Sequence, residues 1–197
     1  MRLQPGRGIS VLSELFPSLL DLVSRTGPPA LSEAARDLDV AHLTKLTEDC
    51  WTSVENRSTD RARFFVRAAL QPYAASFPER LDCPWCAQPP QAGCLRPQGD
   101  GLAFELVCAL CLRRRHYPRT RCPGCESSGK DLATYTTTDF PHLRLQACNA
   151  CQRYLTIVDL SRDAQAIPEV DELAALPLDL WALENGYRKL QENLAGI

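Results

Sequence analysis

Cys122-Pro123-Gly124-Cys125 and Cys148-Asn149-Ala150-Cys151 decide how this chain folds, because each places two thiols two residues apart. An earlier stretch repeats the design with Cys83-Pro84-Trp85-Cys86 and Cys108-Ala109-Leu110-Cys111. A C-x-x-C pair fits a tight turn that points both sulfurs at one ion. Four identical spacings therefore favour metal binding over a disulfide framework. Redox motifs of thioredoxin type are the rival interpretation, but no βαβ pattern surrounds any pair.

The lengths of the gaps predict how the pairs combine. Twenty-one residues separate the first pair from the second, and 22 separate the third from the fourth. Both gaps are slightly longer than those of common four-cysteine zinc sites. Cys-Pro opens both sets, which predicts sequential pairing. The predicted metal ligands are Cys83, Cys86, Cys108 and Cys111 in site 1, and Cys122, Cys125, Cys148 and Cys151 in site 2. In the alternative, the two central pairs, only ten residues apart, share one ion and the outer pairs share the other.

Each gap also carries the pattern of a β-hairpin. We expect strands at 92–96 and 102–107 in the first gap, and at 132–138 and 142–146 in the second. Two cysteine turns around a hairpin, repeated once, predict tandem modules of rubredoxin or zinc-ribbon type. Four thiolates suit zinc or iron alike. Such a site keeps no open position for substrate water, which argues against hydrolytic metal catalysis.

The regions before and after the cysteines have helical periodicity. A helix capped by Asp39 is predicted from Leu43 to Val54, and another from Ser58 until Pro72 interrupts it. The segment 9–23 is apolar on one face and is expected to break at Pro17, and residues 27–29 form a loop. A last amphipathic helix is expected after Pro168, kinked near Pro177 and ending around Leu194.

The predicted fold class is therefore α+β, with two ribbon modules between helical parts. The expected domains are a helical region at 1–78, ribbons at 79–118 and 119–160, and a C-terminal helical segment at 161–197. Cys50 and Cys94 lack partners at ligand spacing, and we expect both to pack as small apolar side chains, with Trp51 between helices.

Composition and charge narrow the functional classes. The 197 residues are 45% hydrophobic and 23% charged, with a formal net charge of −2, as expected of an ordinary soluble protein. No apolar run reaches the roughly 20 residues that a membrane span needs. Residues 1–8 lack the pattern of a signal peptide, so a cytoplasmic location and no membrane insertion are expected.

A basic run lies between the second and third cysteine pairs. Its members are Arg113, Arg114, Arg115, Arg119 and Arg121. They either offset the negative field of the thiolates or bind an acidic partner or nucleic acid. No catalytic arrangement is found: His42, His116 and His142 are scattered, and phosphate-binding and dinucleotide-binding motifs are missing. We therefore expect no enzyme activity.

Several motifs together resemble a known family. They are Cys83-Pro84-Trp85-Cys86, the stretches 106–111, 119–130 and 148–155, and the C-terminal elements 171–179 and 184–187. In this order they resemble the formate dehydrogenase accessory proteins, the FdhE family, over residues 81–190. The resemblance implies a cytoplasmic protein with two rubredoxin-like modules that binds two metal ions, iron by resemblance and zinc as the alternative. It also implies an assembly role, with the catalytic subunit of formate dehydrogenase as partner.

Two other functions compete with that interpretation. A rubredoxin-like electron carrier needs iron, since zinc has no redox chemistry. A zinc-ribbon nucleic-acid binder needs a basic surface. Residues 79–160 carry a net charge of −2 when eight thiolates and two divalent ions are counted, which argues against nucleic acid as a partner.

Overall fold

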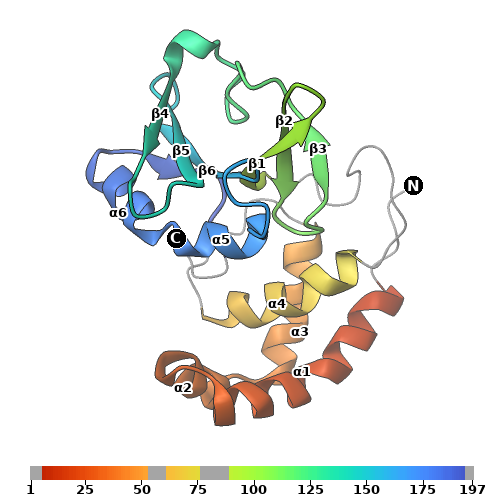
Figure 1. Ribbon diagram of the computed structural model, residues 1–197. Coiled ribbons are helices and arrows are strands. Elements are labelled where there is room, and N and C mark those ends of the chain that lie inside the picture. The colour runs from red at the N-terminus through yellow and green to blue at the C-terminus, as the bar shows by residue number, and fades with distance from the viewer. Residues whose placement is uncertain (1–5, 53–60, 76–88, 194–197) are drawn as a thin grey trace. The chain divides into compact units, whose positions relative to one another are not determined.

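A computed structural model describes residues 6–52, 61–75 and 89–193 (Figure 1). Contacts within the chain divide it into two compact units, Met1–Ala87 and Gln88–Ala195. The four-part division expected from the sequence stays a prediction. The fold class is α+β, as predicted, with helices and a mixed sheet. Among the helices of the described residues, none is long and apolar enough to cross a bilayer.

The described residues of the first unit form four helices. They are α1 (Gly6–Thr26), α2 (Pro29–Asp37), α3 (Val40–Thr52) and α4 (Ala62–Ala75). Their buried side chains include Leu12 and Phe16 of α1, Leu43 of α3 and Phe65 and Leu70 of α4. The start of α3 is as predicted, because the Asp39 carboxylate accepts a hydrogen bond from the backbone N–H of His42 at 3.3 Å.

Two helix breaks expected at prolines do not occur. Helix α1 runs through Pro17, and α4 runs through Pro72 to Ala75. A proline inside a helix removes one backbone hydrogen bond. Here the loss is tolerated because buried Phe16 and Leu20 lie on either side of the exposed Pro17 and hold the α1 face in the core. The side chains of Cys50 and Trp51, with Val54 and the helix start expected at Ser58, lie outside the described residues.

The second unit is a seven-stranded sheet. Its strands are β1 (Pro90–Gln98), β2 (Gly101–Cys108), β3 (Arg114–His116), β4 (Leu132–Thr136), β5 (Leu143–Cys148), β6 (Arg153–Asp159) and β7 (Arg188–Lys189). The strand order is β3-β2-β1-β6-β5-β4, with β7 paired to β6. The β1–β2 and β4–β5 hairpins confirm the two hairpins predicted between the cysteine pairs. Parallel pairing of β1 with β6 joins both hairpins in one sheet.

Helices and apolar side chains cover the two faces of this sheet. Helices α5 (Pro168–Ala174) and α6 (Leu176–Glu184) contribute to one cluster, in which Leu178 packs with Leu145 and Tyr154. The other cluster contains Leu155 of β6 and Leu190. Buried Cys94 packs in β1, as expected from its lack of a ligand partner.

The C-terminal segment differs from the single helix that we predicted. Helix α6 ends at Glu184 instead of near Leu194, and the chain reverses at Gly186, which has a φ of +83°. Glycine adopts this conformation at little cost, so the helix stops here. Tyr187 and Leu190 are thereby buried in separate clusters instead of lying on one helix face.

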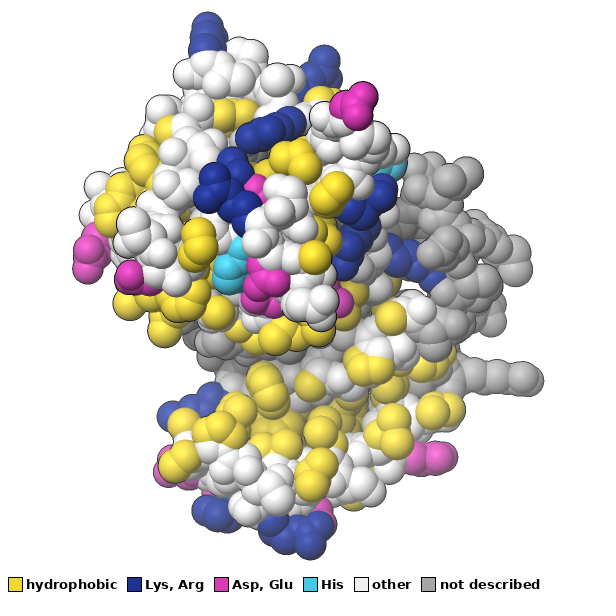
Figure 2. All heavy atoms as spheres, in the orientation of Figure 1, with side chains coloured by type: hydrophobic (Ala, Val, Ile, Leu, Met, Phe, Trp, Pro, Cys, Tyr) yellow, Lys and Arg dark blue, Asp and Glu magenta, His cyan; other side chains and the backbone are white. Residues whose placement is uncertain are grey.

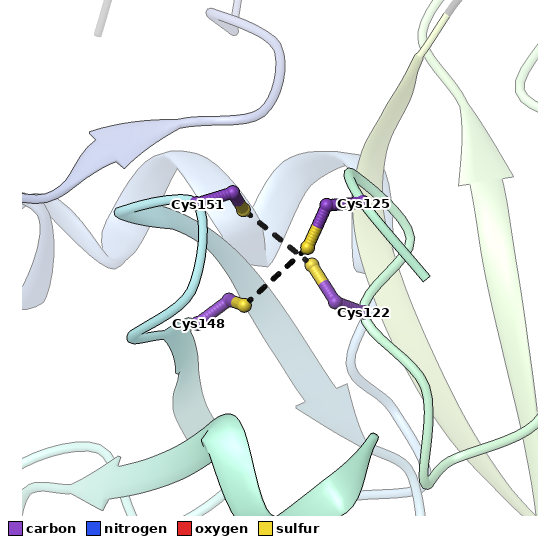
Figure 3. Close-up of side chains that lie close together, drawn as sticks. All are labelled: Cys122, Cys125, Cys148 and Cys151. Carbon is purple, nitrogen blue, oxygen red and sulfur yellow. Dashed lines mark hydrogen bonds between the residues drawn. The ribbon is translucent and has the colours of Figure 1, made fainter. Parts of the chain in front are cut away.

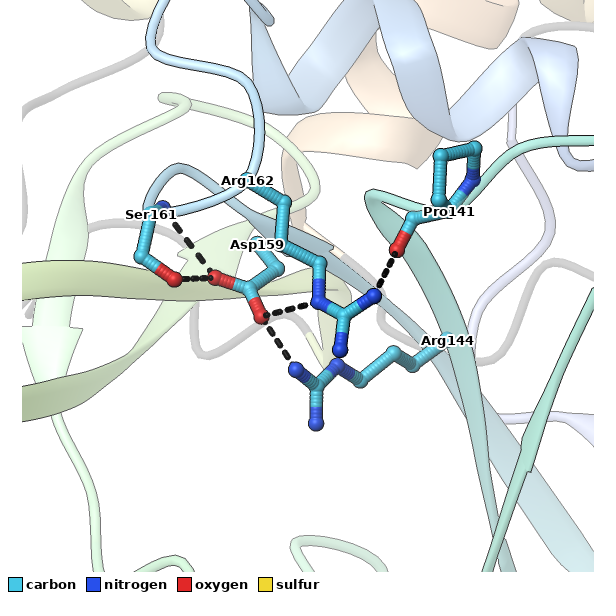
Figure 4. Close-up of polar contacts among 5 residues, drawn as sticks. All are labelled: Pro141, Arg144, Asp159, Ser161 and Arg162. Atoms are coloured by element: carbon cyan, nitrogen blue, oxygen red, sulfur yellow. Dashed lines mark hydrogen bonds and ion pairs between the residues drawn. The ribbon is translucent and has the colours of Figure 1, made fainter. Parts of the chain in front are cut away.

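A buried carboxylate stabilises the end of β6 (Figure 4). Asp159 is fully buried and forms ion pairs with Arg144 and, at 3.8 Å, with Arg162. The backbone N–H of Ser161 also donates to it at 3.1 Å. Burial alone would raise the pKa of Asp159, but these hydrogen bonds and charges outweigh it and hold the pKa below its ordinary value. The carboxylate is therefore an ionised tie between β5, β6 and the turn that follows.

A second buried ionic group ties β7 to the helices. Lys189 contacts Glu172 of α5 and, at 2.9 Å, the Oδ2 atom of Asp179 in α6. All three side chains are at least 97% buried. The amide groups of Gln91 and Asn193 donate to Glu172 at 3.3 and 3.2 Å. The lysine is the cation that both carboxylates share.

Replacing Lys189 with Met should destabilise the second unit strongly, because two buried carboxylates would lose their cation. The expected loss in free energy of unfolding is about 3 kcal/mol. Arg188→Met, at the neighbouring exposed side chain, should cost less than about 0.5 kcal/mol. Urea unfolding followed by circular dichroism measures both, and equal losses would contradict the role assigned to Lys189.

Candidate metal centre

Four sulfurs converge at one end of the second hairpin (Figure 3). Cys122 and Cys125 precede β4, Cys148 ends β5, and Cys151 precedes β6. Their Sγ atoms all lie within 4.8 Å of one another. The distances from Cys122 to Cys151 and from Cys125 to Cys148 are both 3.7 Å. Tetrahedral zinc with Zn–S bonds of about 2.3 Å requires sulfurs about 3.8 Å apart. The set could therefore bind one metal ion in tetrahedral geometry.

The backbone of each cysteine turn explains why the two thiols face the same way. Glu126 N–H donates to the Cys122 carbonyl at 2.8 Å, and Gln152 N–H donates to the Cys148 carbonyl at 2.9 Å. Both donors lie directly after the second cysteine and have positive φ, 60° and 55°. In each turn, the left-handed residue after the second cysteine donates its N–H to the carbonyl of the first cysteine. The two cysteine side chains therefore point to the same side of the turn. The turn requires two residues between the cysteines, which is the C-x-x-C spacing.

Hydrogen bonds to the sulfurs favour their thiolate forms. Gly124 N–H donates to Cys122 Sγ at 3.3 Å. Ser127 Oγ lies 3.3 Å from Cys125 Sγ and 3.1 Å from Cys148 Sγ. Hydrogen bonding with the hydroxyl and the backbone of Ser127 lowers the pKa of Cys125 to about 6. Burial raises the pKa of Cys148, but the bond from Ser127 and those from the following turn outweigh it, so the pKa lies below its ordinary value.

In the other two thiols of this set, burial has the largest effect on the pKa. Burial raises the pKa of Cys151 to about 12 and also raises the pKa of Cys122. A metal ion displaces protons from cysteine because only the thiolate is a good ligand. The set thus combines sulfurs that ionise readily with sulfurs that ionise when an ion is bound.

Half of the first predicted set lies within the described residues. Cys108 and Cys111 are joined by the same turn, in which Leu112 has a φ of 56° and its N–H donates to the Cys108 carbonyl at 3.1 Å. A hydrogen bond from Cys108 lowers the pKa of Cys111 to about 6. Cys83 and Cys86, the other half of the set, lie outside the described residues. The equal turns make Cys108 and Cys111 suitable as half of a four-sulfur site.

The basic run lies along the edge of the sheet. Arg114 and Arg115 are exposed on β3, which pairs only with β2 among the described strands. Arg119 and Arg121 are exposed in the segment that leads to Cys122, and Arg113 is half-buried. Figure 2 shows Lys and Arg side chains on the face where β3 lies in Figure 1.

Two histidine side chains lie beside acidic residues. His116 lies 3.7 Å from Glu105, and His142 lies 3.1 Å from Asp171.

Several residues around the four sulfurs were not predicted from the sequence to contact the cysteine turns. Ser127 bonds to two sulfurs, and Tyr117 donates its hydroxyl to the Cys122 carbonyl at 3.1 Å. Tyr187 donates to Asn149, between Cys148 and Cys151, at 2.6 Å. A polar side chain two residues after a C-x-x-C pair is a local signal that could have identified Ser127. The positions of Tyr117 and Tyr187 in the sequence give no sign that they contact the cysteine turns, because only folding brings them there.

The fold and the sulfurs define an α+β protein with a four-cysteine site suited to one metal ion, and comparison with known proteins identifies its family. The family model "FdhE, C-terminal domain" matches residues 120–195. The FdhE homologue of Aquifex aeolicus is 30% identical over 195 residues, which cover 92% of this chain and 69% of that protein. The chain therefore belongs to the FdhE family.

Further relatives have the same name. The FdhE protein of Escherichia coli is 29% identical over 94% of this chain and 62% of its own length. The homologue of Pseudomonas putida is 39% identical over 57% of this chain and 37% of its own length. The crystal structure of the FdhE protein from Pseudomonas aeruginosa matches with a TM-score of 0.70 and 28% identity. That match covers 94% of this chain and 72% of the other.

Replacing Ser127 with Ala should raise the pKa of Cys125 from about 6 toward its ordinary 9.0, because the thiolate loses its bond with the hydroxyl and keeps only the bond with the backbone of residue 127. Only the thiolate reacts with iodoacetamide, so alkylation of Cys125 at pH 7 should slow down. Mass spectrometry of metal-free protein, labelled between pH 5 and pH 9, measures the midpoint. Ser128→Ala is the control and should leave the midpoint near pH 6. An unchanged midpoint in Ser127→Ala would contradict the role of this hydroxyl.

Proposed function

We propose that this protein is a cytoplasmic accessory factor that assists formate dehydrogenase assembly by binding the catalytic subunit of that enzyme. The observation that carries the proposal is a four-sulfur site in a chain of the FdhE family. The proposed role is binding rather than catalysis. Four protein ligands complete a tetrahedral site and leave no position for a substrate.

Each of two metal ions would be held by four thiolates. The ligands of site 2 are Cys122, Cys125, Cys148 and Cys151, and those of site 1 are Cys83, Cys86, Cys108 and Cys111. Support for site 2 comes from the 3.7 Å sulfur distances and the hydrogen bonds that stabilise thiolates. Support for site 1 is the equal turn at Cys108 and Cys111. The ion is iron by family resemblance, and zinc suits the same ligands.

The proposed partner surface is the basic run at the edge of the sheet. Arg114 and Arg115 are exposed on β3, and Arg119 and Arg121 extend the positive charge toward Cys122. Arginine offers several donors in one plane and binds carboxylates through two hydrogen bonds. An acidic surface of the catalytic subunit would fit this edge, and such binding should weaken as salt screens the charges.

The metal assignment predicts the effect of removing single cysteines. Wild-type protein should contain two ions per chain, and Cys148→Ser and Cys83→Ser should each lose one. Both hairpins belong to one sheet, so loss of either ion should lower the free energy of unfolding of the second unit, measured by urea unfolding. Replacing Cys50 or Cys94 should leave the metal content unchanged. Mass spectrometry of metals measures the content, and two ions in Cys148→Ser would contradict site 2.

The partner is tested in the host. Tagged protein should co-purify with the formate dehydrogenase catalytic subunit, and deletion should lower formate dehydrogenase activity. Replacing Arg113, Arg114 and Arg115 together with Gln should preserve the metal content and abolish partner recovery.

The matched control replaces three exposed arginines of the helical unit, Arg25, Arg36 and Arg61, with Gln and should recover the partner normally. Full enzyme activity after deletion, with no catalytic subunit on the tag, would refute the proposed function. Partner recovery by the variant at 113–115 would instead assign the interface to another surface.

A further inference from the structure

We propose that residues 187–190, which we call the C-terminal strap, position both halves of site 2 and control the rate at which its metal ion is released. The strap lies directly after the reversal at Gly186 and includes β7. The inference rests on the proposed metal binding by Cys122, Cys125, Cys148 and Cys151. It adds a role for residues that are not themselves ligands.

The strap binds the turn between Cys148 and Cys151. The Tyr187 hydroxyl donates to Asn149 Oδ1 at 2.6 Å, and Asn149 lies within the turn itself. Arg188 N–H donates at 2.9 Å to the carbonyl of Gln152, the left-handed residue that closes the turn. Leu190 N–H then donates to the Tyr154 carbonyl at 2.9 Å. Side-chain and backbone bonds thus hold this turn from outside.

The same strap packs on the turn between Cys122 and Cys125. A Cβ atom built on Gly124 would lie 2.7 Å from Leu190 Cδ2, so a larger residue there would require the Leu190 side chain to shift. The same position is 3.7 Å from Cys122 Sγ, so Leu190 lies beside the site. Leu190 is 8% exposed and belongs to the apolar cluster of β1, β2 and β6. One strap therefore contacts two turns whose cysteines are separated by 22 residues of sequence.

Lys189 fixes the strap between these contacts. Its ammonium group is buried against Glu172 and Asp179, so it links the strap to α5 and α6. The strap can leave the turns only if this ion group is broken or carried along. The ordered position of Tyr187 and Leu190 thus follows from the packing of the helices, and it holds the two turns in the geometry that one ion requires.

Binding of the ion and docking of the strap should consequently stabilise each other. Ligands that favour the same arrangement are coupled by equal free energies in both directions. Groups that orient metal ligands from outside the coordination shell typically change affinity by about 10-fold to 100-fold when removed. Loss of a strap contact should therefore accelerate ion release from site 2 and leave site 1 unaffected.

The test is zinc release from the loaded full-length chain to a chromogenic chelator. Wild-type protein should release zinc in two phases, and Cys148→Ser should lack the phase of site 2. Tyr187→Phe removes the hydroxyl, with its bonds to Asn149 and Tyr135, and Leu190→Ala removes the packing on Gly124. Each should accelerate the site 2 phase by roughly tenfold.

Matched variants separate positioning from general destabilisation. Arg188→Gln keeps the backbone bond of the strap and should release zinc at the wild-type rate. Leu190→Met retains an apolar side chain of similar size and should largely restore the rate lost in Leu190→Ala. Wild-type release rates in both Tyr187→Phe and Leu190→Ala would overturn the inference while leaving site 2 intact. A site 2 phase that persists in Cys148→Ser would refute the metal assignment, and the inference with it.

The effect of ion binding on the strap gives a second test of the coupling. In Cys148→Ser, amide hydrogen exchange of a peptide covering 186–191 should be faster than in wild type, because Arg188 and Leu190 lose the turns that hold their N–H groups. A peptide from α1, which belongs to the first unit, should exchange as in wild type. Equal exchange at 186–191 in the two proteins would contradict the coupling.

Discussion

The convergence of four sulfurs is the constraint on which the rest of the second unit depends. Thiolates within 4.8 Å of one another repel strongly unless a cation or protons offset their charge. The protein meets this constraint with two equal backbone turns and with hydrogen bonds from Gly124 and Ser127. The pairing registers of β4 with β5 and of β5 with β6 bring these two turns together. The sheet thus positions the four sulfurs.

Buried charge is used twice to fix elements around this sheet. Asp159 ties the end of β6 to Arg144 on β5, and Lys189 ties β7 to both helices. Both groups pair every buried ion with an opposite charge, which is the condition for burying charge at acceptable cost. Lys189 lies in the segment after α6 that contacts the cysteine turns, so residues distant in sequence stabilise one small site.

The sequence predicted local features well and missed those that depend on packing. The two hairpins followed from alternation and turn residues, and the cap at Asp39 followed from its position before an apolar helix. Pro17 does not break α1, because burial of Phe16 and Leu20 outweighs one lost hydrogen bond. The last helix ends early because Gly186 permits the chain to reverse. After the reversal, β7 pairs with β6.

By itself the sequence determined the chemistry of the candidate site: the cysteine pairs at 122/125 and 148/151 and the turn that each pair forms. A C-x-x-C turn is closed by bonds within five residues, so its geometry follows from local spacing. Only the tertiary structure decided that β1 pairs with β6 and that Tyr187 and Leu190 lie on the turns. These contacts join segments that are far apart in the chain, and they form because whole apolar faces and buried charges must find partners together.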